Sequence, residues 1–228
     1  MYTAASAAAV DGGYAIQLDG RNVRTPARAL LVVPREILAE AVVAEWNAQG
    51  EHIEHQSMPM TRFANTALDN VRGRELEIID EITAFAASDL ICYRAETPRG
   101  LVAAQQASWD CVLAWVEETF DARFVPVAGV MHTPQPAPGL AVVREAVAGY
   151  DGFALTGLHN MTTLTGSALL ALACAHGHIG PEETWERAHV DEDWQISQWG
   201  SDAEAAARRV HRGEEFAAAY RFLKLRVG

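Results

Sequence analysis

Apolar and polar residues alternate along the first 33 positions with the two-residue period of a β-strand. Apolar side chains recur at every second position of residues 14–18, directly before Asp19 and Gly20. This pair forms tight hairpin turns because both residues tolerate a positive φ. The pattern predicts an antiparallel hairpin followed by a further strand at residues 30–33.

After Pro34 the spacing of apolar positions changes to that of an amphipathic helix. Pro34 occupies a favoured first-turn position, and Gly50 follows the last apolar position of the segment. The residues expected on the buried face are Leu38, Ala41, Val42 and Trp46.

From Thr61 onward, apolar residues recur at the i, i+3, i+4, i+7 spacing of helices. A break is expected near Gly73, and four prolines make residues 126–138 irregular. Pro181 marks one helix start, and Ser201 with Glu204 reads as the capping box of the last helix. Helices are predicted at residues 101–120, 140–149, 153–175, 181–199 and 201–225.

These elements predict an α+β protein with two domains. A small N-terminal antiparallel β-rich domain with one helix is expected at residues 1–60, followed by a larger, mostly α-helical domain at residues 61–228. No internal repeat and no low-complexity linker separates the two parts.

Composition and charge exclude several classes of function. The chain has 228 residues, of which 50% are hydrophobic and 21% charged, as in a folded globular protein. Its net charge of −12 argues against binding nucleic acid or an anionic membrane surface. Lys224 is the single lysine and does not follow a Gly-rich loop, so no P-loop is present.

Cysteine usage and hydropathy favour a soluble protein of a reducing compartment. Cys92, Cys111 and Cys174 are widely spaced in apolar surroundings and form no CxxC unit. Residues 1–10 lack the basic start of a signal peptide, and the longest apolar run, residues 168–175, is too short to span a bilayer.

The segment Asp191 to Glu204 concentrates five carboxylates and two tryptophans without a basic residue. Tryptophan beside charged groups is typical of a surface where a protein partner docks. The alternative is that Trp194 and Trp199 anchor the core and the acids form a solvated face. Composition alone leaves both interpretations open.

Histidines and acids were considered as candidates for metal binding and catalysis. His52 to His55 is one residue short of an inverted zinc-protease motif, and His176-Gly177-His178 is expected at a helix end. We therefore expect no metal and no cofactor. A hydrolase or isomerase using Asp191 and Glu192 as acid and base is the alternative function, although neighbouring helical residues point about 100° apart.

Residues 56–69 connect the two predicted domains and contain Met58, Met60 and Arg62. Two methionines around a proline suit an adaptable apolar contact, and Thr61 could cap the following helix. The segment is therefore either an internal joint or an adaptable binding surface.

Motifs in a fixed order resemble one known family over nearly the whole chain. They are LDGR (18–21), TP (25–26), AEWNAQ (44–49), MPMTR (58–62), DLICYRA (89–95), WD (109–110), GS (166–167), DEDWQ (191–195) and WG (199–200). The chain resembles the assembly chaperones for the α subunit of the ATP synthase catalytic sector, found in mitochondria and alphaproteobacteria. One departure is the start, where relatives carry an aromatic-basic stretch and only Tyr2 remains.

The resemblance implies a non-enzymatic chaperone that holds the unassembled α subunit until the β subunit replaces it. It implies a small β domain with a helical domain, no catalytic residues and no cofactor. We expect a monomer in the bacterial cytoplasm, with eukaryotic relatives in the mitochondrial matrix, and neither nucleic-acid binding nor membrane insertion. The rival interpretation is a general anti-aggregation factor without a preferred client.

Residues for the client contact follow as a hypothesis from this resemblance and from the acidic segment. Arg94 is a candidate internal partner of one of the acids, while Trp46, Trp109 and Trp115 are assigned to packing. The residues expected to contact the client are Asp191, Glu192, Asp193, Trp194, Trp199, Asp202, Met58, Met60 and Arg62.

Overall fold

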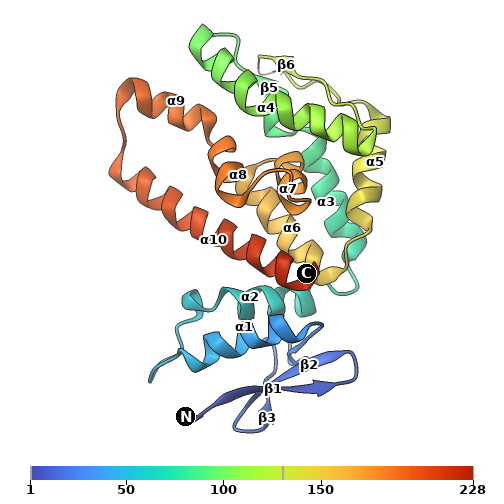
Figure 1. Cartoon of the computed structure of the whole chain (residues 1–228), viewed down its shortest axis with the longest axis vertical. Helices are drawn as coiled ribbons and strands as arrows, with labels where there is room; N and C mark the ends of the chain where they lie inside the picture. Colours follow the sequence, from blue (N-terminus) through green and yellow to red (C-terminus); the bar gives the residue numbers. More distant parts are fainter. Residues whose placement is uncertain (1, 130, 228) are drawn as a thin grey trace. The chain divides into compact units, whose positions relative to one another are not determined.

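The computed structural model describes residues 2–129 and 131–227 (Figure 1). The chain divides into two compact units. The sheet unit comprises Met1–Glu75, Asp151–Gly157 and Ala218–Gly228, and the helical unit comprises Leu76–Tyr150 and Leu158–Ala217. This division differs from the expected boundary at residue 60, because residues 151–157 and 218–228 group with the N-terminal part of the chain, where the Phe222 ring lies 5.4 Å from that of Phe63.

The sheet unit contains a small antiparallel sheet, as its alternating pattern predicted. Strand β2 pairs with β1, β3 and β4, and Asp19 and Gly20 turn the β2–β3 hairpin with φ values of 47° and 76°. The strands are β1 (Ala5–Val10), β2 (Gly13–Leu18), β3 (Arg21–Asn22) and β4 (Val32–Val33).

Helix α1 (Glu36–Asn47) lies beside β1 and β2 within the sheet unit (Figure 1). It buries the expected face, including Leu38 and Val42, but begins after Pro34 rather than at it. The carboxylate of Glu45 accepts hydrogen bonds from the first amides of α2 (Pro59–Thr66), at 2.6 and 2.8 Å. Glu45 therefore caps α2, the role that the sequence suggested for Thr61.

The helical unit contains most of the remaining elements, and together the two units form the α+β fold that the sequence predicted. A π-helical turn, Ala67–Val71, follows α2, and Gly73 breaks the chain before α3 with a φ of 80°. The later elements are α3 (Glu75–Ala87), β5 (Tyr93–Arg94), α4 (Arg99–Phe120), β6 (Val127–Ala128), α5 (Ala137–Ala148), α6 (Gly152–Thr165), α7 (Ala168–Ala175), α8 (Pro181–Arg187), α9 (Val190–Trp199) and α10 (Ala203–Val227).

Two expected helices are each interrupted. The predicted helix at 153–175 is α6 and α7, separated by Gly166 at a φ of 70°. A Cβ added to Gly166 would meet nothing within 4 Å, so this glycine serves a turn and not a close approach of two helices. Likewise, the predicted helix at 181–199 is two helices, α8 and α9. The acidic residues 191–193 therefore lie at the start of a separate helix and not in the middle of a long one.

Helix α7 forms the centre of the helical unit, since every one of its residues is buried. The carboxylate of Asp89 accepts hydrogen bonds from the amide of Leu169 at 3.0 Å, in the first turn of α7, and from the amide of Ile91 at 3.3 Å. Complete burial raises the pKa of Asp89 from 3.8 to about 7. Asp89 thus links the start of α7 to the 3₁₀ turn Leu90–Cys92.

None of the helices in the described part of the chain has the length and apolar character needed to cross a membrane.

Candidate protein-binding site

Helix α9 carries the acidic segment at its N-terminal end. Asp191, Glu192 and Asp193 occupy its first turn, where carboxylates interact favourably with the positive end of the helix dipole. None of the α9 side chains is fully buried. The helix is therefore held by a few specific contacts, and those contacts determine which of its side chains remain available to a partner.

Two of the acids have roles within the protein. Asp191 accepts a hydrogen bond from the Gln105 amide nitrogen at 2.7 Å, and the Gln105 amide oxygen accepts one from the backbone of Ala95 at 2.8 Å. Asp202 accepts a hydrogen bond from the backbone of Ala205 at 2.8 Å and so caps α10. The residue that caps this helix is thus Asp202, not Ser201.

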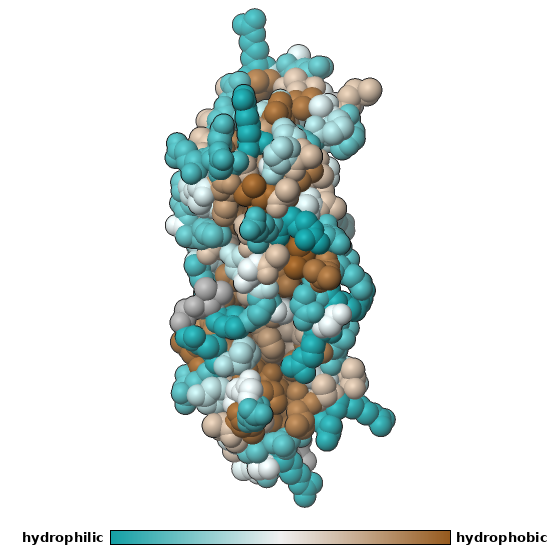
Figure 2. All heavy atoms as spheres, turned by 90° about the vertical axis from the view of Figure 1, so that its right-hand side faces the viewer, coloured by the Kyte–Doolittle hydropathy of each residue, from teal (hydrophilic) through white to brown (hydrophobic). Residues whose placement is uncertain are grey.

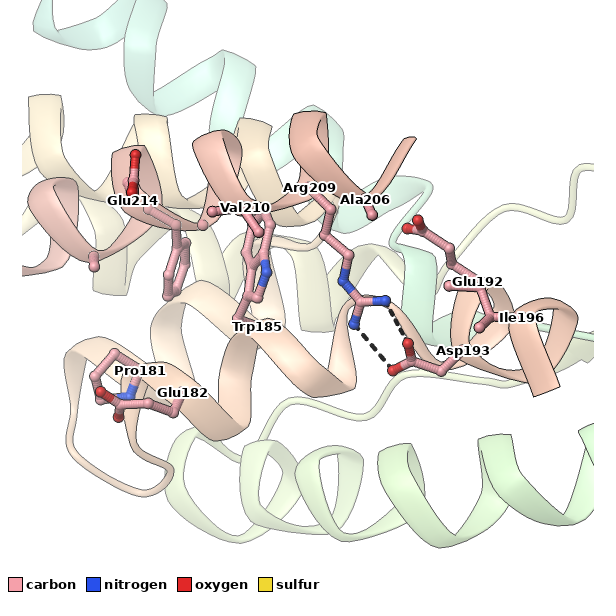
Figure 3. Close-up of a pocket in the computed structure, with 13 residues that line it drawn as sticks. Pro181, Glu182, Trp185, Glu192, Asp193, Ile196, Ala206, Arg209, Val210 and Glu214 are labelled. Carbon is pink, nitrogen blue, oxygen red and sulfur yellow. Dashed lines mark hydrogen bonds and ion pairs between the residues drawn. The ribbon is translucent and has the colours of Figure 1, made fainter. Parts of the chain in front are cut away.

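Asp193 forms an ion pair with Arg209 of α10 (Figure 3). Nη2 of Arg209 lies 3.0 Å from Oδ2 of Asp193, and Nη1 donates a second hydrogen bond to Oδ1. The hydrogen bond to Asp193 raises the pKa of Arg209. These two hydrogen bonds join α9 to α10, and the guanidinium of Arg209 neutralises the charge of Asp193.

Glu192 differs from the other acids of the α9 first turn in its weak pairing, since Asp193 is more exposed, at 50%, but is bound to Arg209. The Glu192 side chain is 37% exposed, and Nε2 of His189 lies 4.0 Å from its carboxylate. Nδ1 of His189 lies 2.7 Å from the Trp185 carbonyl oxygen. Burial lowers the pKa of His189, which disfavours a charged partner for Glu192 at neutral pH.

The two tryptophans of the segment have different environments. Trp194 is half-buried, and its ring lies so close to Gly100 of α4 that a Cβ there would be 2.1 Å from Cη2. Trp194 therefore packs against α4, and its expected contact with a client stays a prediction. Trp199, the last residue of α9, is 79% exposed.

A groove of about 610 Å³ lies between α8, α9 and α10 (Figure 3). Figure 3 draws Glu182 and Glu214 toward one end of it and Glu192 toward the other. Its apolar lining comprises Pro181, Trp185, Ile196, Ala206, Val210, Phe216 and Ala217.

The groove was not predicted from the sequence, although α10 contains a pattern that indicates it. In α10, Ala206, Val210, Gly213 and Ala217 recur at helical spacing, and Val210 is 64% exposed. Exposed apolar residues alone do not indicate a binding groove. On the face shown in Figure 2, apolar patches are interrupted by hydrophilic side chains, as on ordinary protein surfaces. The groove differs because apolar walls and carboxylates converge there.

Met58, Met60 and Arg62 belong to the sheet unit. Met58 and Met60 are 0% and 1% exposed and fill its core. An exposed methionine surface is therefore the wrong interpretation of this segment, because burial leaves no methionine surface for a client. The Arg62 guanidinium carbon lies 6.0 Å from the centre of the Phe63 ring.

Arg94 does not pair with the acidic segment. Its Nη1 lies 2.9 Å from Asp110 of α4, and its guanidinium lies 5.1 Å from the Trp109 ring centre. The packing roles expected for Trp46 and Trp109 agree with their exposed fractions of 9% and 0%. The Trp109 indole also donates a hydrogen bond to the carbonyl of Arg187 at 2.8 Å.

No cluster of His, Cys, Asp and Glu within residues 2–129 and 131–227 could hold a metal ion. Acid–base catalysis by Asp191 and Glu192 would need a histidine close by, but His159 lies 2.8 Å from Glu81 of α3. His189 is next to the acids but is bound to a backbone carbonyl. The arrangement around α9 thus favours binding over acid–base catalysis.

Comparisons with known proteins identify the family. Residues 1–117 match the family described as ATP12 chaperone protein. The chain is 23% identical over 208 residues to mitochondrial atp12 of Schizosaccharomyces pombe. The aligned region covers 84% of this chain and 70% of that protein.

Solved structures agree over almost the full length. Atp12 from Paracoccus denitrificans is 35% identical, with a TM-score of 0.95 over 99% of this chain and 97% of that chain. A candidate chaperone from Agrobacterium tumefaciens is 43% identical, with a TM-score of 0.96 over 100% of this chain and 85% of that chain. These relatives are named as chaperones and not as enzymes, which confirms the family expected from the sequence motifs. The chain belongs to the ATP12 family of ATP synthase assembly chaperones.

Proposed function

We propose that this protein binds the unassembled α subunit of the ATP synthase catalytic sector and hands it over to the β subunit. Membership in the ATP12 chaperone family supports an assembly client. The structural observation that supports a binding site is the exposure of Glu192 and Trp199 on α9, beside an apolar groove. A carboxylate and a large aromatic ring on one helix can recognise a surface that is both cationic and apolar.

The physical need for such a protein is clear. A subunit that is not yet assembled exposes the apolar surface of its future interface, and such surfaces aggregate. A chaperone must cover this surface and later release it, which favours a few strong contacts within a polar rim. Competition by the β subunit for the same surface releases the client without nucleotide hydrolysis.

The residues of the acidic segment divide between two roles in this proposal. Asp191, Asp193 and Asp202 orient α9 and α10 through their internal hydrogen bonds. Glu192 offers its carboxylate to an arginine or lysine of the client, and Trp199 supplies the apolar anchor. We expect the chaperone to act as a monomer in the bacterial cytoplasm, where the α subunit is synthesised.

A pull-down tests this function. The tagged protein is incubated with an alphaproteobacterial lysate depleted of ATP synthase β subunit, and the bound proteins are identified by mass spectrometry. We expect recovery of the α subunit at near-equal stoichiometry and its release on addition of purified β subunit. Absence of the α subunit from the bound fraction would refute the proposal.

The same assay distinguishes a dedicated chaperone from a general anti-aggregation factor. Heat-denatured citrate synthase, an unrelated protein, is offered under identical conditions. We expect little binding relative to the α subunit. Equal protection of both proteins against aggregation would favour the general factor and contradict a preferred client.

A further inference from the structure

The groove between α8, α9 and α10 has features that specify what it can bind. Its floor and walls are apolar, with the Trp185 ring lying against the α10 backbone at Gly213. A Cβ at Gly213 would lie 3.2 Å from Nε1 of Trp185, so glycine allows this close approach. The groove is therefore a preformed apolar trough and not a gap between loosely packed helices.

The rim of the groove is acidic. Glu182 and Glu214 lie toward one end and Glu192 toward the other (Figure 3). Asp193 is neutralised by Arg209, so Glu182, Glu192 and Glu214 leave the groove lining with a net negative charge. Glu214 lies 3.8 Å from His211, and Glu192 lies 4.0 Å from His189 and also borders a hollow lined by Arg208, Arg209 and Arg212. Charge complementarity thus favours an occupant with basic side chains on both sides of an apolar one.

The walls also select the backbone conformation of the occupant. All three walls are helices, whose backbone N–H and C=O groups are hydrogen-bonded within the helix apart from the terminal turns. They present no unpaired strand edge. An extended segment buried in the groove would leave its own backbone groups without partners, whereas a helix satisfies its own.

A second copy of this chain is a poor occupant. The chain carries a net charge of −12, and the rim is acidic, so two copies would repel each other at this surface.

We propose that this groove receives a helical segment of the client that presents one apolar side chain flanked, one turn away on each side, by arginine or lysine. The apolar side chain contacts Trp185 and Val210, and the basic side chains reach Glu192 and Glu214. This inference rests on the proposed chaperone function, because it describes the part of the client that is held.

A designed peptide tests the groove without the client. The probe is a fluorescein-labelled, alanine-based helical peptide of about five turns. It has a central leucine and an arginine one turn away on each side, and its binding is measured by fluorescence anisotropy. One comparison peptide has glutamate in place of both arginines, and another has a proline after the leucine, which breaks the helix. We expect the arginine peptide to bind at least tenfold more tightly than either.

Substitutions locate the binding. Val210→Asp places a charge in the exposed part of the apolar wall and should weaken peptide binding at least fivefold. The matched control is Leu76→Asp on α3, because Leu76 is similarly exposed, at 67%, but does not line the groove. Circular dichroism of both variants checks that they remain folded. Undiminished binding to Val210→Asp, or equal binding of the proline and arginine peptides, would overturn the inference.

The two proposals can fail separately. If the wild type and Val210→Asp capture the α subunit equally, the groove inference fails while the chaperone function stands. If the peptide binds as expected but no α subunit is captured, the groove inference stands, and the proposal that the α subunit is the client fails. A dimer of the wild type that dissociates on Val210→Asp substitution would show that a second copy occupies the groove, and would overturn the inference.

Discussion

Asp193 of α9 and Arg209 of α10 are joined by two hydrogen bonds, one of them 3.0 Å long between Oδ2 and Nη2. Since α9 has no fully buried residue, it is oriented by this ion pair, by the hydrogen bond of Asp191 with Gln105 and by the packing of Trp194 on α4. The orientation of α9 determines where Glu192 and Trp199 point. Hence the ion pair contributes to the proposed site without contacting the client.

Reversing one charge of this pair should loosen α9. Arg209→Asp places two carboxylates opposite each other and should lower the free energy of unfolding by about 1 kcal/mol, since the pair is partly exposed. It should also accelerate tryptic cleavage at Arg187 and Arg208, which flank the α9 region. The double variant Asp193→Arg with Arg209→Asp restores opposite charges. Equal cleavage rates in the single and double variants would contradict a role for the pair.

Gly100 should be required for the packing of Trp194. In an ordinary helix, alanine is more favourable than glycine by up to about 1 kcal/mol. Here the Cβ of Gly100→Ala would overlap the Trp194 ring, at 2.1 Å from Cη2. We expect a loss of about 1 kcal/mol in the free energy of unfolding, measured by urea denaturation. Adding Trp194→Leu should recover part of this loss, and a stabilised Gly100→Ala would show that the ring is free to move.

Local sequence signals predicted those parts of the fold that depend on neighbouring residues. Asp19 and Gly20 turn the β2–β3 hairpin, and Gly177 follows the end of α7 with a φ of 75°, because these conformations are encoded by the residues themselves. The break at Gly166 was not predicted, because an isolated glycine between apolar segments can also lie inside a continuous helix. In the structure its φ of 70° separates α6 from α7.

Tertiary partners could not be read from the sequence in the same way. The pairing of Arg94 with Asp110 and of Asp193 with Arg209 joins residues on different elements. The burial of Met58 likewise depends on the complete sheet unit. The acidic segment was recognisable from composition. Which of its acids are bound internally depends on partners on other helices, such as Gln105 of α4 and Arg209 of α10.

Glu192 should be the acid most important for client capture. Glu192→Arg reverses a charge at the groove whose nearest ion-pair candidate is His189 at 4.0 Å, so we expect α subunit capture to fall at least tenfold. The thermal unfolding midpoint should change little. Glu118→Arg, an exposed residue of α4 outside the groove, is the matched control and should capture normally. A folded Glu192→Arg protein with full client protection would remove the acidic contact from the proposal.

Trp199 should contribute to binding and not to stability. Its side chain is 79% exposed, so Trp199→Ala should change the free energy of unfolding by less than about 0.5 kcal/mol. Loss of an aromatic anchor should reduce α subunit capture by about fivefold. Leu76→Ala removes an apolar side chain that is 67% exposed elsewhere in the helical unit and should leave capture unchanged. Equal capture by Trp199→Ala and the wild type would show that α9 does not use this residue.

The buried carboxyl group of Asp89 should make stability depend on pH. Burial raises its pKa to about 7, whereas the ordinary value is 3.8. The folded state therefore holds the proton to a higher pH than the unfolded chain does. The protonated Asp89 carboxyl group therefore contributes fully to the free energy of unfolding below about pH 4. This contribution is lost as the pH rises toward about 7.

Asp89→Asn isolates this effect, because asparagine resembles the protonated carboxyl group at every pH. The variant should be less stable than the wild type, since Ile91 and Leu169 donate to different oxygens of Asp89 and the amide oxygen of asparagine can replace only one of these acceptors. Its deficit in unfolding free energy should shrink by about 1 kcal/mol between about pH 6 and pH 8, as the wild type ionises. Urea denaturation at several pH values measures this difference. A deficit that grows with pH would mean that these two amides hold Asp89 as a charged carboxylate, with a lowered pKa, at the start of α7.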